Sequence, residues 1–599
     1  MTRPSLLSEL KRRNVLRAAA LYIGTVWLLA QVVTQLGPVF DTPAWVARWF
    51  LVGSAVGFPF WIAFAWFYEL TPEGLKRESE VASDDSIRKL TSRRLDRAII
   101  AVLAVAVVLL LTNTFMRPRG TRTGDAASAV PAKSIAVLPF ANASRDPDQQ
   151  FFSDGLSENL IGSLSRFGGL KVIGRISAFQ FRDSKDDSAT IGRKLGVAYL
   201  LSGSVQHAGD VVRINASLTN AADGSTLWAE HYDRPYKNLF ALQDEITYAV
   251  AGALQVKLLS PRPAAKQGDR PPSGNLEAYG AYLRGLTYWH GENFPKAAAY
   301  MAKAVQLDPD YAMAWALLSG SLSTVATFEG EPPEVAREDA RKARLAADKA
   351  LQLAPGLGAA HAARAYLLIY GFDHRGALAE CRRAVQLAPD DGTVLNGCGY
   401  GLAQIGKLGE AIRLRERLLS IEPLYVINYQ QYAQLLMATG RLGEAEKYLR
   451  TAESLPQTDL VWHHSTAFLR MTAAMARGEA DAAMHIATQA PTETRNLFIA
   501  LAAQVGPDRA AADAALAAVL KDKAYAESHA YWIAQAYALR GDASHAVAWL
   551  ERASAPDLLF LLADPVILRL RDDPRFIAFC EKTGLPPPSE SEALGLDQI

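Results

Sequence analysis

The sequence predicts a multidomain protein with three parts in order: three transmembrane helices, an α/β domain, and an all-α superhelix of paired helices. Three observations predict this order. Long uncharged apolar runs lie before residue 117, short apolar stretches alternate with amphipathic ones between 133 and 257, and a 34-residue period follows. At 599 residues the chain is too long for one compact core, so several domains are expected.

Composition excludes several classes of partner and site. The chain has 63 lysines and arginines against 62 acidic residues, so charge gives no reason to expect nucleic acid as a partner. Its cysteines, Cys381, Cys398 and Cys580, form no CxxC pair and have no companion histidines at metal-binding spacing. We therefore predict no metal site and no cofactor.

The first part, residues 1–116, is predicted to be a membrane anchor in contact with the lipid bilayer. Residues 18–40, 49–68 and 98–116 carry no charge, and each run is long enough to cross the hydrocarbon core as a helix. A secretory signal peptide is the alternative for the first run. That run is longer than a signal peptide's apolar region, and no small-residue cleavage site follows it.

Flanking charge predicts the direction of these helices. Five lysines and arginines precede the first run, seven lie between the second and third, and only Arg48 lies between the first and second. Positive charge is retained in the cytoplasm. The pattern predicts a multi-pass protein of a bacterial inner membrane, with a cytoplasmic amino terminus and residues after 117 in the periplasm.

A linker at 117–132 leads into an α/β domain predicted for 133–257. Residues 134–140, "SIAVLPF", have the pattern of a buried strand. The acidic stretch "SRDPDQQFFSDGLSENL" follows, and Leu156, Leu160, Leu164 and Phe167, in and after it, have the spacing of one helix face. Paired catalytic carboxylates need a cleft with residues on two sides, and this stretch supplies only one side. We interpret it as a turn and a helix start, with Ser153 or Asp154 as the cap.

The rest of this domain alternates between strands and helices. A strand at 170–175 precedes a helix that ends at Gly196. The period then becomes two, around turns at Gly209-Asp210 and Asp223-Gly224, which predicts a three-stranded antiparallel meander. A helix with Leu242, Ile246, Val250 and Leu254 on one face closes the domain.

The blocks "SIAVLPFAN", "FFSDGLSENLIGSLSRF", "LGVAYLLSGSV", "LWAEHYDR" and "FALQDEI" occur in order across nearly all of 133–257. Together they resemble the TolB amino-terminal-like domain that precedes tetratricopeptide repeats (TPR) in many bacterial proteins. The segments "ELKRRNVLRAAALYIGTVWLL" and "FYELTPEGLKRESEV" resemble the membrane-anchored branch of that group.

The resemblance implies a fold but no catalytic residue. In related proteins this unit is joined to class III nucleotide cyclases, winged-helix DNA-binding domains or protein kinases, and such sequences are often labelled as cyclases. Before residue 133 the predicted membrane helices leave no room for a cyclase domain or its two metal-binding aspartates. We therefore expect no enzyme activity.

After a linker at 258–272, residues 273–585 are predicted to form a TPR superhelix of about seven helical pairs, followed by a tail at 586–599. Small residues stand at Ala343, Ala377, Ala411 and Ala445, three successive intervals of 34 residues. Ala297 lies 46 residues before the first of them, which implies a 12-residue insertion. Between 457 and 525 the register blurs. The segment "DPVILRLRDDPRFIAFCEKTGLP" is predicted to cap the last helix.

Stacked helical pairs form a superhelix with a concave groove that typically binds extended peptides or protein segments. The repeat register places eight aromatic and amide residues in this groove: Tyr282, Trp289, Tyr366, Tyr370, Asn396, Tyr400, Gln430 and Gln434. This set lacks a lysine or arginine to clamp a terminal carboxylate, so we expect an internal or apolar segment as the ligand. The alternative for any one tyrosine is packing between helices.

Two smaller sets of residues remain. His463 and His464 are adjacent on a predicted helix and point about 100° apart, which is poor geometry for one metal ion. Cys381 and Cys398 fall at core positions of neighbouring helices. They are expected as buried free thiols, with a disulfide as the alternative in an oxidising compartment.

These features favour a non-enzymatic, membrane-anchored scaffold or adaptor whose TPR groove binds protein partners. The alternative is a transmembrane signalling receptor, in which the α/β domain senses a ligand and regulates a cytoplasmic partner. A ligand pocket would separate the two, and the sequence contains no phosphate-binding loop of the GxxxxGK[ST] or GxGxxG type to mark one.

Overall fold

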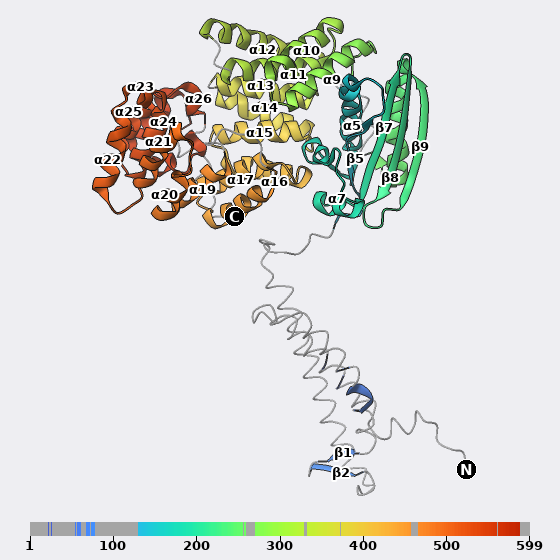
Figure 1. Ribbon diagram of the computed structural model, residues 1–599, viewed down its shortest axis with the longest axis horizontal. Helices are drawn as coiled ribbons and strands as arrows, with labels where there is room; N and C mark the ends of the chain where they lie inside the picture. The colour runs from blue at the N-terminus through green and yellow to red at the C-terminus, as the bar shows by residue number, and fades with distance from the viewer. Residues whose placement is uncertain are drawn as a thin grey trace. The chain divides into compact units, whose positions relative to one another are not determined.

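The computed structural model describes residues 22, 26, 54, 57–60, 68–71, 74–77, 130–255, 257–258, 270–328, 332–371, 373–456, 465–559 and 561–586. The chain divides into two compact units, Met1–Ala126 and Ala127–Ile599. Each unit is described by itself (Figure 1).

In the first unit, the described residues up to Phe60 are helical, and β1 (Tyr68–Thr71) pairs with β2 (Gly74–Arg77) as an antiparallel hairpin. Across the described part of the chain, no helix combines the length and the apolar character needed to cross a membrane. This finding contradicts the predicted three-helix anchor. The predicted spans at 18–40, 49–68 and 98–116 lie almost wholly outside the described residues, and Tyr68, the last residue of the second span, begins a strand.

The predicted location is corrected with the anchor. The multi-pass inner-membrane topology, with residues after 117 in the periplasm, rested entirely on those three runs. An uncharged apolar run is necessary for a membrane span but does not by itself establish one, because apolar runs are also buried within protein.

The second unit begins with a mixed sheet in the order β6-β3-β7-β8-β9, with β4 also paired to β7. Strand β3 is parallel to both β6 and β7, whereas β7, β8 and β9 form an antiparallel meander. The strands are β3 (Ser134–Val137), β4 (Ala141–Asn142), β6 (Lys171–Ile173), β7 (Tyr199–Ala208), β8 (Val211–Asn220) and β9 (Thr226–Pro235). A separate two-residue pairing joins β5 (Phe167–Gly168) to β10 (Lys257–Leu258).

Helices pack on both faces of this sheet. Helices α5 (Gln150–Leu164) and α8 (Leu239–Ala253) share one buried cluster with Ile135 and Val137 of β3. Helices α6 (Arg175–Ala178) and α7 (Ser188–Leu195) share another with Ala136, whose side chain points to the opposite face. Alternation along β8 buries Val212, Ile214 and Leu218 in the cluster that also contains α5 and α8 side chains. Helix α7 ends at Gly196, whose φ of 64° is left-handed and suits glycine.

The acidic stretch forms a turn and a helix, but the predicted cap is wrong, and the helix ends at Leu164, so Phe167 lies on β5 instead. Asp146 caps a short 3₁₀ helix, η3 (Pro147–Gln149), by accepting a 2.9 Å hydrogen bond from the Asp148 amide. Helix α5 continues directly from this turn, and its N-cap makes no side-chain hydrogen bond. Ser153 and Asp154 therefore lie inside the helix, where Asp154 pairs with Arg182 at 2.6 Å.

From 276 to 550 the described helices form eight antiparallel pairs, with the short α23 between the seventh and eighth. The first four pairs are α9 (Leu276–His290) with α10 (Phe294–Leu307), α11 (Ala312–Phe328) with α12 (Pro333–Leu353), α13 (Gly358–Tyr370) with α14 (His374–Leu387), and α15 (Gly392–Gln404) with α16 (Leu408–Ile421). The later pairs are α17 (Val426–Ala438) with α18 (Leu442–Ser454), α19 (Thr466–Arg477) with α20 (Ala480–Ala487), α21 (Thr492–Ala503) with α22 (Arg509–Leu520), and α24 (Ala530–Leu539) with α25 (Ala543–Leu550). The short helix α23 spans Lys523–Ser528.

The 34-residue period has a direct structural cause. Ala343, Ala377, Ala411 and Ala445 are fully buried. A small residue at this position lets neighbouring helices pack closely. Each of α10, α12, α14 and α16 ends two residues before a proline, which cannot continue the helix.

After α25 the chain forms α26 (Ala555–Leu558), two 3₁₀ helices, η7 (Leu561–Ala563) and η8 (Ile567–Leu570), and α27 (Pro574–Thr583). Helix α27 packs on α25, and η8 packs on α24. This segment covers the last helical pair.

One glycine tests the packing of the sheet. A methyl group on Gly203 would overlap the carbonyl oxygen of Asn215 on the neighbouring strand and lie 2.7 Å from the Phe140 ring. We expect Gly203→Ala to lower the free energy of unfolding by about 1–3 kcal/mol, because neither neighbour has room to move. Urea unfolding followed by circular dichroism measures this.

Gly162→Ala is the matched control. Gly162 lies on α5 with open space around its Cα, so alanine should leave stability unchanged or raise it by up to about 1 kcal/mol. Equal effects of the two substitutions would contradict the packing described for Gly203.

Candidate interaction surface

The first repeat is covered by the α/β domain. Helix α5 packs along α9, where the Leu283 side chain fills the space left by Gly155. The Tyr279 hydroxyl accepts hydrogen bonds from the side-chain amides of Asn159 on α5 and Gln243 on α8, the latter at 3.0 Å. Figure 1 shows α9 beside α5, and these contacts join the first repeat to the sheet domain.

Charged groups reinforce this contact. The Glu158 carboxylate on α5 lies 2.9 Å from His290 Nε2 at the end of α9 and 3.2 Å from Arg175 Nε. Burial opposes ionisation of Glu158, but the nearby His290 and Arg175 outweigh it, so the pKa of this carboxyl lies below its ordinary value. The ion cluster therefore holds α5, α6 and α9 together.

A second contact joins the α/β domain to the turn between α16 and α17. The Glu422 carboxylate accepts hydrogen bonds from the backbone amides of Ile176 (3.1 Å) and Ser177 (2.7 Å). The Gly174 amide donates to the Ile421 carbonyl at 2.8 Å, and the Leu424 amide donates to Ser177 Oγ at 3.0 Å. Four hydrogen bonds thus fix this turn against the start of α6.

The Glu422 side chain is only 3% exposed. Burial raises the pKa of its carboxyl to about 7, although the Ser177 and Ile176 donors act in the opposite direction. Gly174 makes this close approach feasible, because a methyl group there would overlap the carboxylate. The raised pKa predicts that the docking of the two domains depends on pH.

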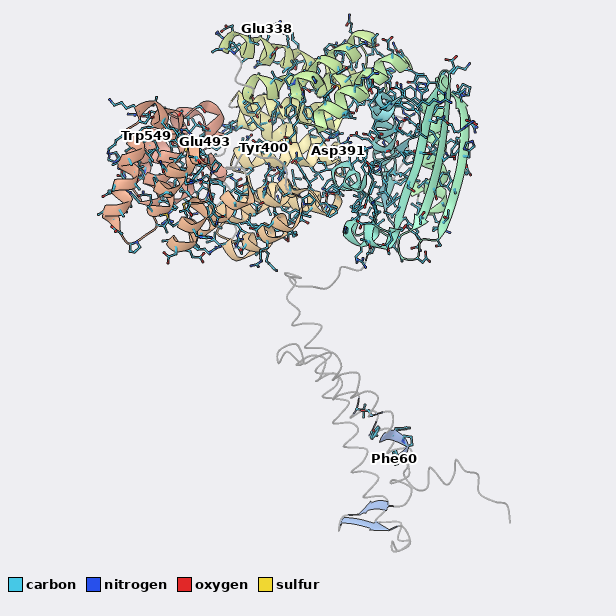
Figure 2. All side chains as sticks on the ribbon, in the orientation of Figure 1. Phe60, Glu338, Asp391, Tyr400, Glu493 and Trp549 are labelled. Atoms are coloured by element: carbon cyan, nitrogen blue, oxygen red, sulfur yellow. The ribbon has the colours of Figure 1, made fainter. Side chains whose placement is uncertain are left out.

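Between these contacts, the first helices of neighbouring repeats bring tyrosines together. The rings of Tyr366 and Tyr370 on α13 meet edge to face with centroids 4.7 Å apart. Tyr400 on α15 lies close to both, and burial raises its pKa well above the ordinary value. All three side chains are half-buried. Figure 2 labels Tyr400, and also Asp391 at the end of α15 nearer the sheet domain.

A buried arginine supports this cluster from behind. Arg415 on α16 is 1% exposed, and its guanidinium donates to Asn396 Oδ1 at 2.6 Å and to Asn428 Oδ1 at 3.3 Å. Burial lowers the pKa of this group to about 10. Arg415 orients Asn396 and is itself enclosed, so it does not present a free charge to a ligand.

The carboxyl-terminal segment also reaches the middle repeats. Leu559, Ala563 and Leu568 belong to the same buried cluster as side chains of α13, α15 and α17. The segment is held in place by the buried Asp564, which accepts hydrogen bonds from the Tyr531 hydroxyl (2.7 Å) and the Val566 amide (2.8 Å). It therefore fills part of the surface that a ligand would otherwise contact.

The eight groove residues predicted from the register divide into two groups. Tyr282 is buried beside Tyr311, Trp289 packs against Phe294, and the buried Gln430 donates to Thr466 Oγ1 at 3.0 Å, so these three serve internal contacts. The remaining five are half-buried on α13, α15 and α17: Tyr366, Tyr370, Asn396, Tyr400 and Gln434. The structure brings Tyr366, Tyr370 and Tyr400 into one cluster.

Sequence reasoning missed Glu422 and Arg415. The sequence contained a signal for Glu422. The residue before the helix-ending proline is acidic in two repeats, as Asp308 and Glu422, and alanine in two others. Both acids hold a distant segment, and Asp308 accepts a hydrogen bond from the Ser273 amide at 3.1 Å. Arg415 gave no signal, since an arginine on a second helix usually faces solvent.

The two histidines His463 and His464 lie outside the described residues. Cys381 and Cys398 are buried free thiols, and Cys398 Sγ lies 3.7 Å from the Cys381 carbonyl oxygen. Contact with Cys381 and burial raise the pKa of the Cys398 thiol well above its ordinary value, so it is protonated at neutral pH.

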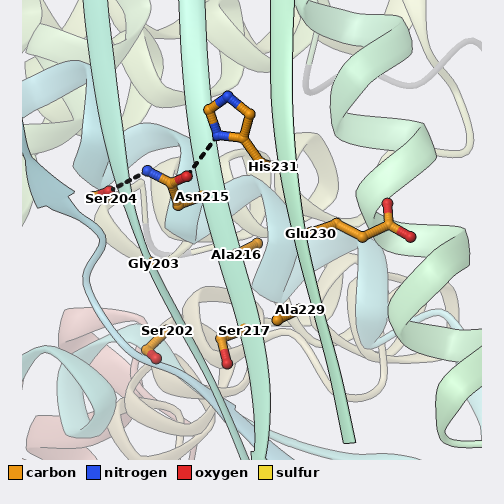
Figure 3. Close-up of a pocket in the computed structure, with 9 residues that line it drawn as sticks. All are labelled: Ser202, Gly203, Ser204, Asn215, Ala216, Ser217, Ala229, Glu230 and His231. Carbon is orange, nitrogen blue, oxygen red and sulfur yellow. Dashed lines mark hydrogen bonds between the residues drawn. The ribbon is translucent and has the colours of Figure 1, made fainter. Parts of the chain in front are cut away.

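The face of the β7-β8-β9 meander opposite α5 and α8 contains a shallow concavity of about 440 Å³ (Figure 3). Small and polar residues line it, among them Ser204, Asn215 and His231. Asn215 donates to Ser204 Oγ at 3.1 Å, and its Oδ1 lies 2.7 Å from His231 Nδ1. No nucleophile is activated by this chain of contacts, because Ser204 is joined to an amide rather than to a base.

Replacement of Glu422 by glutamine tests the pH dependence of docking. The docked pKa of about 7 exceeds the ordinary 4.5, so the contribution of Glu422 is complete below about pH 4.5 and lost as pH rises through 7. We expect the unfolding free energy of the native chain to fall by roughly 2–3 kcal/mol relative to Glu422→Gln across this range.

Urea titrations at half-unit pH steps measure both proteins. Glu338→Gln is the control. Glu338 is exposed on α12, and its hydrogen bond with Arg341 lowers the pKa of its carboxyl, so it stays ionised from about pH 4.5 to 7 and its replacement should leave the profile unchanged over this range. Parallel profiles for the native chain and Glu422→Gln would contradict the assignment.

Comparison with known proteins gives matches to two family models. Residues 131–249 match the second domain of HilA/YgeH-like transcriptional regulators, and residues 278–311 and 428–459 match the tetratricopeptide repeat. A curated protein of Rhizobium meliloti (strain 1021), "Putative adenylate cyclase 3", is 40% identical over 196 residues, which are 32% of this chain and 33% of that protein. The match thus spans about a third of that relative's length.

Solved structures give weaker likenesses. PilW, a type IV pilus biogenesis factor, is 20% identical with a TM-score of 0.28, over 36% of this chain and 92% of that one. YrrB, a TPR protein with an unusual peptide-binding site, is 20% identical with a TM-score of 0.21, over 32% and 92%. Scores this low carry no argument. The chain contains tetratricopeptide repeats and a HilA-like domain, and the TolB-like assignment stays a prediction.

Proposed function

We propose that this chain is a non-catalytic scaffold whose repeats bind an internal, apolar segment of a protein partner. One observation carries the proposal: Tyr366, Tyr370 and Tyr400 gather, half-buried, on the first helices of two adjacent repeats. First helices line the concave side of such superhelices, which is where solenoid proteins bind ligands. Tyrosine provides a large contact area with a polar end.

The chemistry of the cluster supports an apolar rather than a terminal segment. A terminal carboxylate needs an accessible cation, and the nearby Arg415 is enclosed and bonded to Asn396 and Asn428. The α/β domain covers α9, and η7 packs on α15 and α17. We therefore place the binding stretch between these two contacts, along α11, α13 and the near side of α15.

We propose no catalytic role. The match covers only about a third of the Rhizobium protein, and this sequence contains no phosphate-binding loop of the GxxxxGK[ST] or GxGxxG type. Tetratricopeptide repeats support a protein-interaction scaffold, which needs no chemistry at the surface that it offers.

In-cell crosslinking followed by mass spectrometry tests the proposal with the full chain. The triple variant Tyr366→Ala, Tyr370→Ala, Tyr400→Ala should lose at least about nine-tenths of the captured partner, because the aromatic contact area is removed. The corresponding triple phenylalanine variant keeps the rings and should retain most capture.

Tyr248→Ala is the control, since Tyr248 is 60% exposed on α8, away from the cluster. Melting temperatures of all variants are measured alongside. Full capture by a folded alanine variant would contradict the proposal, as would equal loss in the control.

A further inference from the structure

Strand β9 is an open edge of the sheet. The strand order ends at β9, and among the described residues no strand pairs with its outer side (Figure 1). Nearly all of its ten residues are partly or fully exposed. A register shift at Leu218/Thr219 marks one end, and Pro235 marks the other, which leaves a regular stretch between them. Unpaired edges of this kind are templates for another strand.

The sequence of this edge is self-complementary in charge. It runs Glu230-His231-Tyr232-Asp233-Arg234, so acidic and basic residues stand at mirror positions around Tyr232. We propose that a second copy of the chain pairs antiparallel with β9, with Tyr232 on the two-fold axis. Glu230 then lies opposite the partner's Arg234, and His231 lies opposite the partner's Asp233. Symmetry repeats each pair. Glu230 and Arg234 have opposite charges, which are stabilising directly across strands, and His231 can donate a hydrogen bond to the partner's Asp233.

Neighbouring registers lack this complementarity. An axis through Glu230 or Asp233 places a carboxylate directly opposite its own copy, which is destabilising. An axis through His231 places Glu230 opposite Tyr232 and Ala229 opposite Asp233, with no pair of opposite charges. In a continuous sheet, directly opposed residues of the two strands point to the same face. A two-fold axis between two residues would oppose residues that point to opposite faces, so such axes are excluded. The register centred on Tyr232 is the favoured one.

The charges involved are available for this pairing. Within one chain, Asp233 pairs with Arg213 at 2.9 Å and lies 3.5 Å from His231 Nε2. Arg234 pairs with Glu245 at 3.2 Å, and these five side chains are 42–53% exposed. Exposed ion pairs contribute little to stability, so they rearrange or share a partner at low cost. Beside the edge, the small residues Ala229 and Ser217 lie next to Asn215 and His231 on the face opposite α5 and α8 (Figure 3).

This inference is independent of the proposed groove, because it uses a different domain. If it holds, the dimer presents two superhelices on one continuous sheet. Two linked binding surfaces raise the apparent affinity for a partner that is itself multivalent.

Sedimentation equilibrium of the full chain tests the pairing by a charge swap. Glu230→Arg places two like-charge pairs across the axis and should weaken self-association about tenfold or more. The double variant Glu230→Arg, Arg234→Glu restores opposite charges and should recover association to within about threefold of the native chain. Glu338→Arg makes the same change in net charge on α12, away from β9, and should have no effect.

Circular dichroism and melting temperature establish that each variant is folded. Weakening by Glu230→Arg with recovery in the double variant supports the proposal. A monomeric native chain overturns it, as does an unchanged dimer in Glu230→Arg or a failure of the folded double variant to recover. Association of β9 with a strand of a different protein, while the native chain alone stays monomeric, also overturns it.

Discussion

The buried carboxylate of Glu422 is the contact on which the arrangement of the second unit depends. It lies in the turn between two repeats and receives two backbone amides from the start of α6. Burying a carboxyl group without hydrogen-bond donors is unfavourable in free energy. The Glu422 side chain has its donors only when the turn is docked on α6, so the two segments stabilise each other in that arrangement. Together with the α5 and α9 contact, this fixes which side of the superhelix the α/β domain covers, and hence which tyrosines remain half-exposed.

Local patterns in the sequence predicted local structure well. Leu156, Leu160 and Leu164 lie on one buried face of α5, and Gly196 ends α7 in the left-handed conformation that glycine favours. The buried alanines of the repeats follow from close helix approach. Each of these features is determined by residues a few positions apart, because the spacing of apolar residues in the sequence matches the period of burial.

Long-range contacts were the features that the sequence did not predict. Tyr282 and Gln430 occupy positions that face a groove in an isolated superhelix, but here they pack within the repeats. Asp154 has the character of a helix cap, yet its carboxylate pairs with Arg182. The apolar runs before residue 117 illustrate the same limit. An apolar run indicates that a segment avoids water, but it does not indicate whether lipid or protein surrounds the segment.

The hydrogen bonds to Glu422 join residues 245 and 246 positions apart in the chain. This separation has a consequence during synthesis. At a ribosomal rate of about 5–20 residues per second, the amides of Ile176 and Ser177 emerge roughly 12–50 s before the carboxylate that they bind. For that interval the nascent α/β domain has an unfinished surface, which closes only when the fourth repeat arrives.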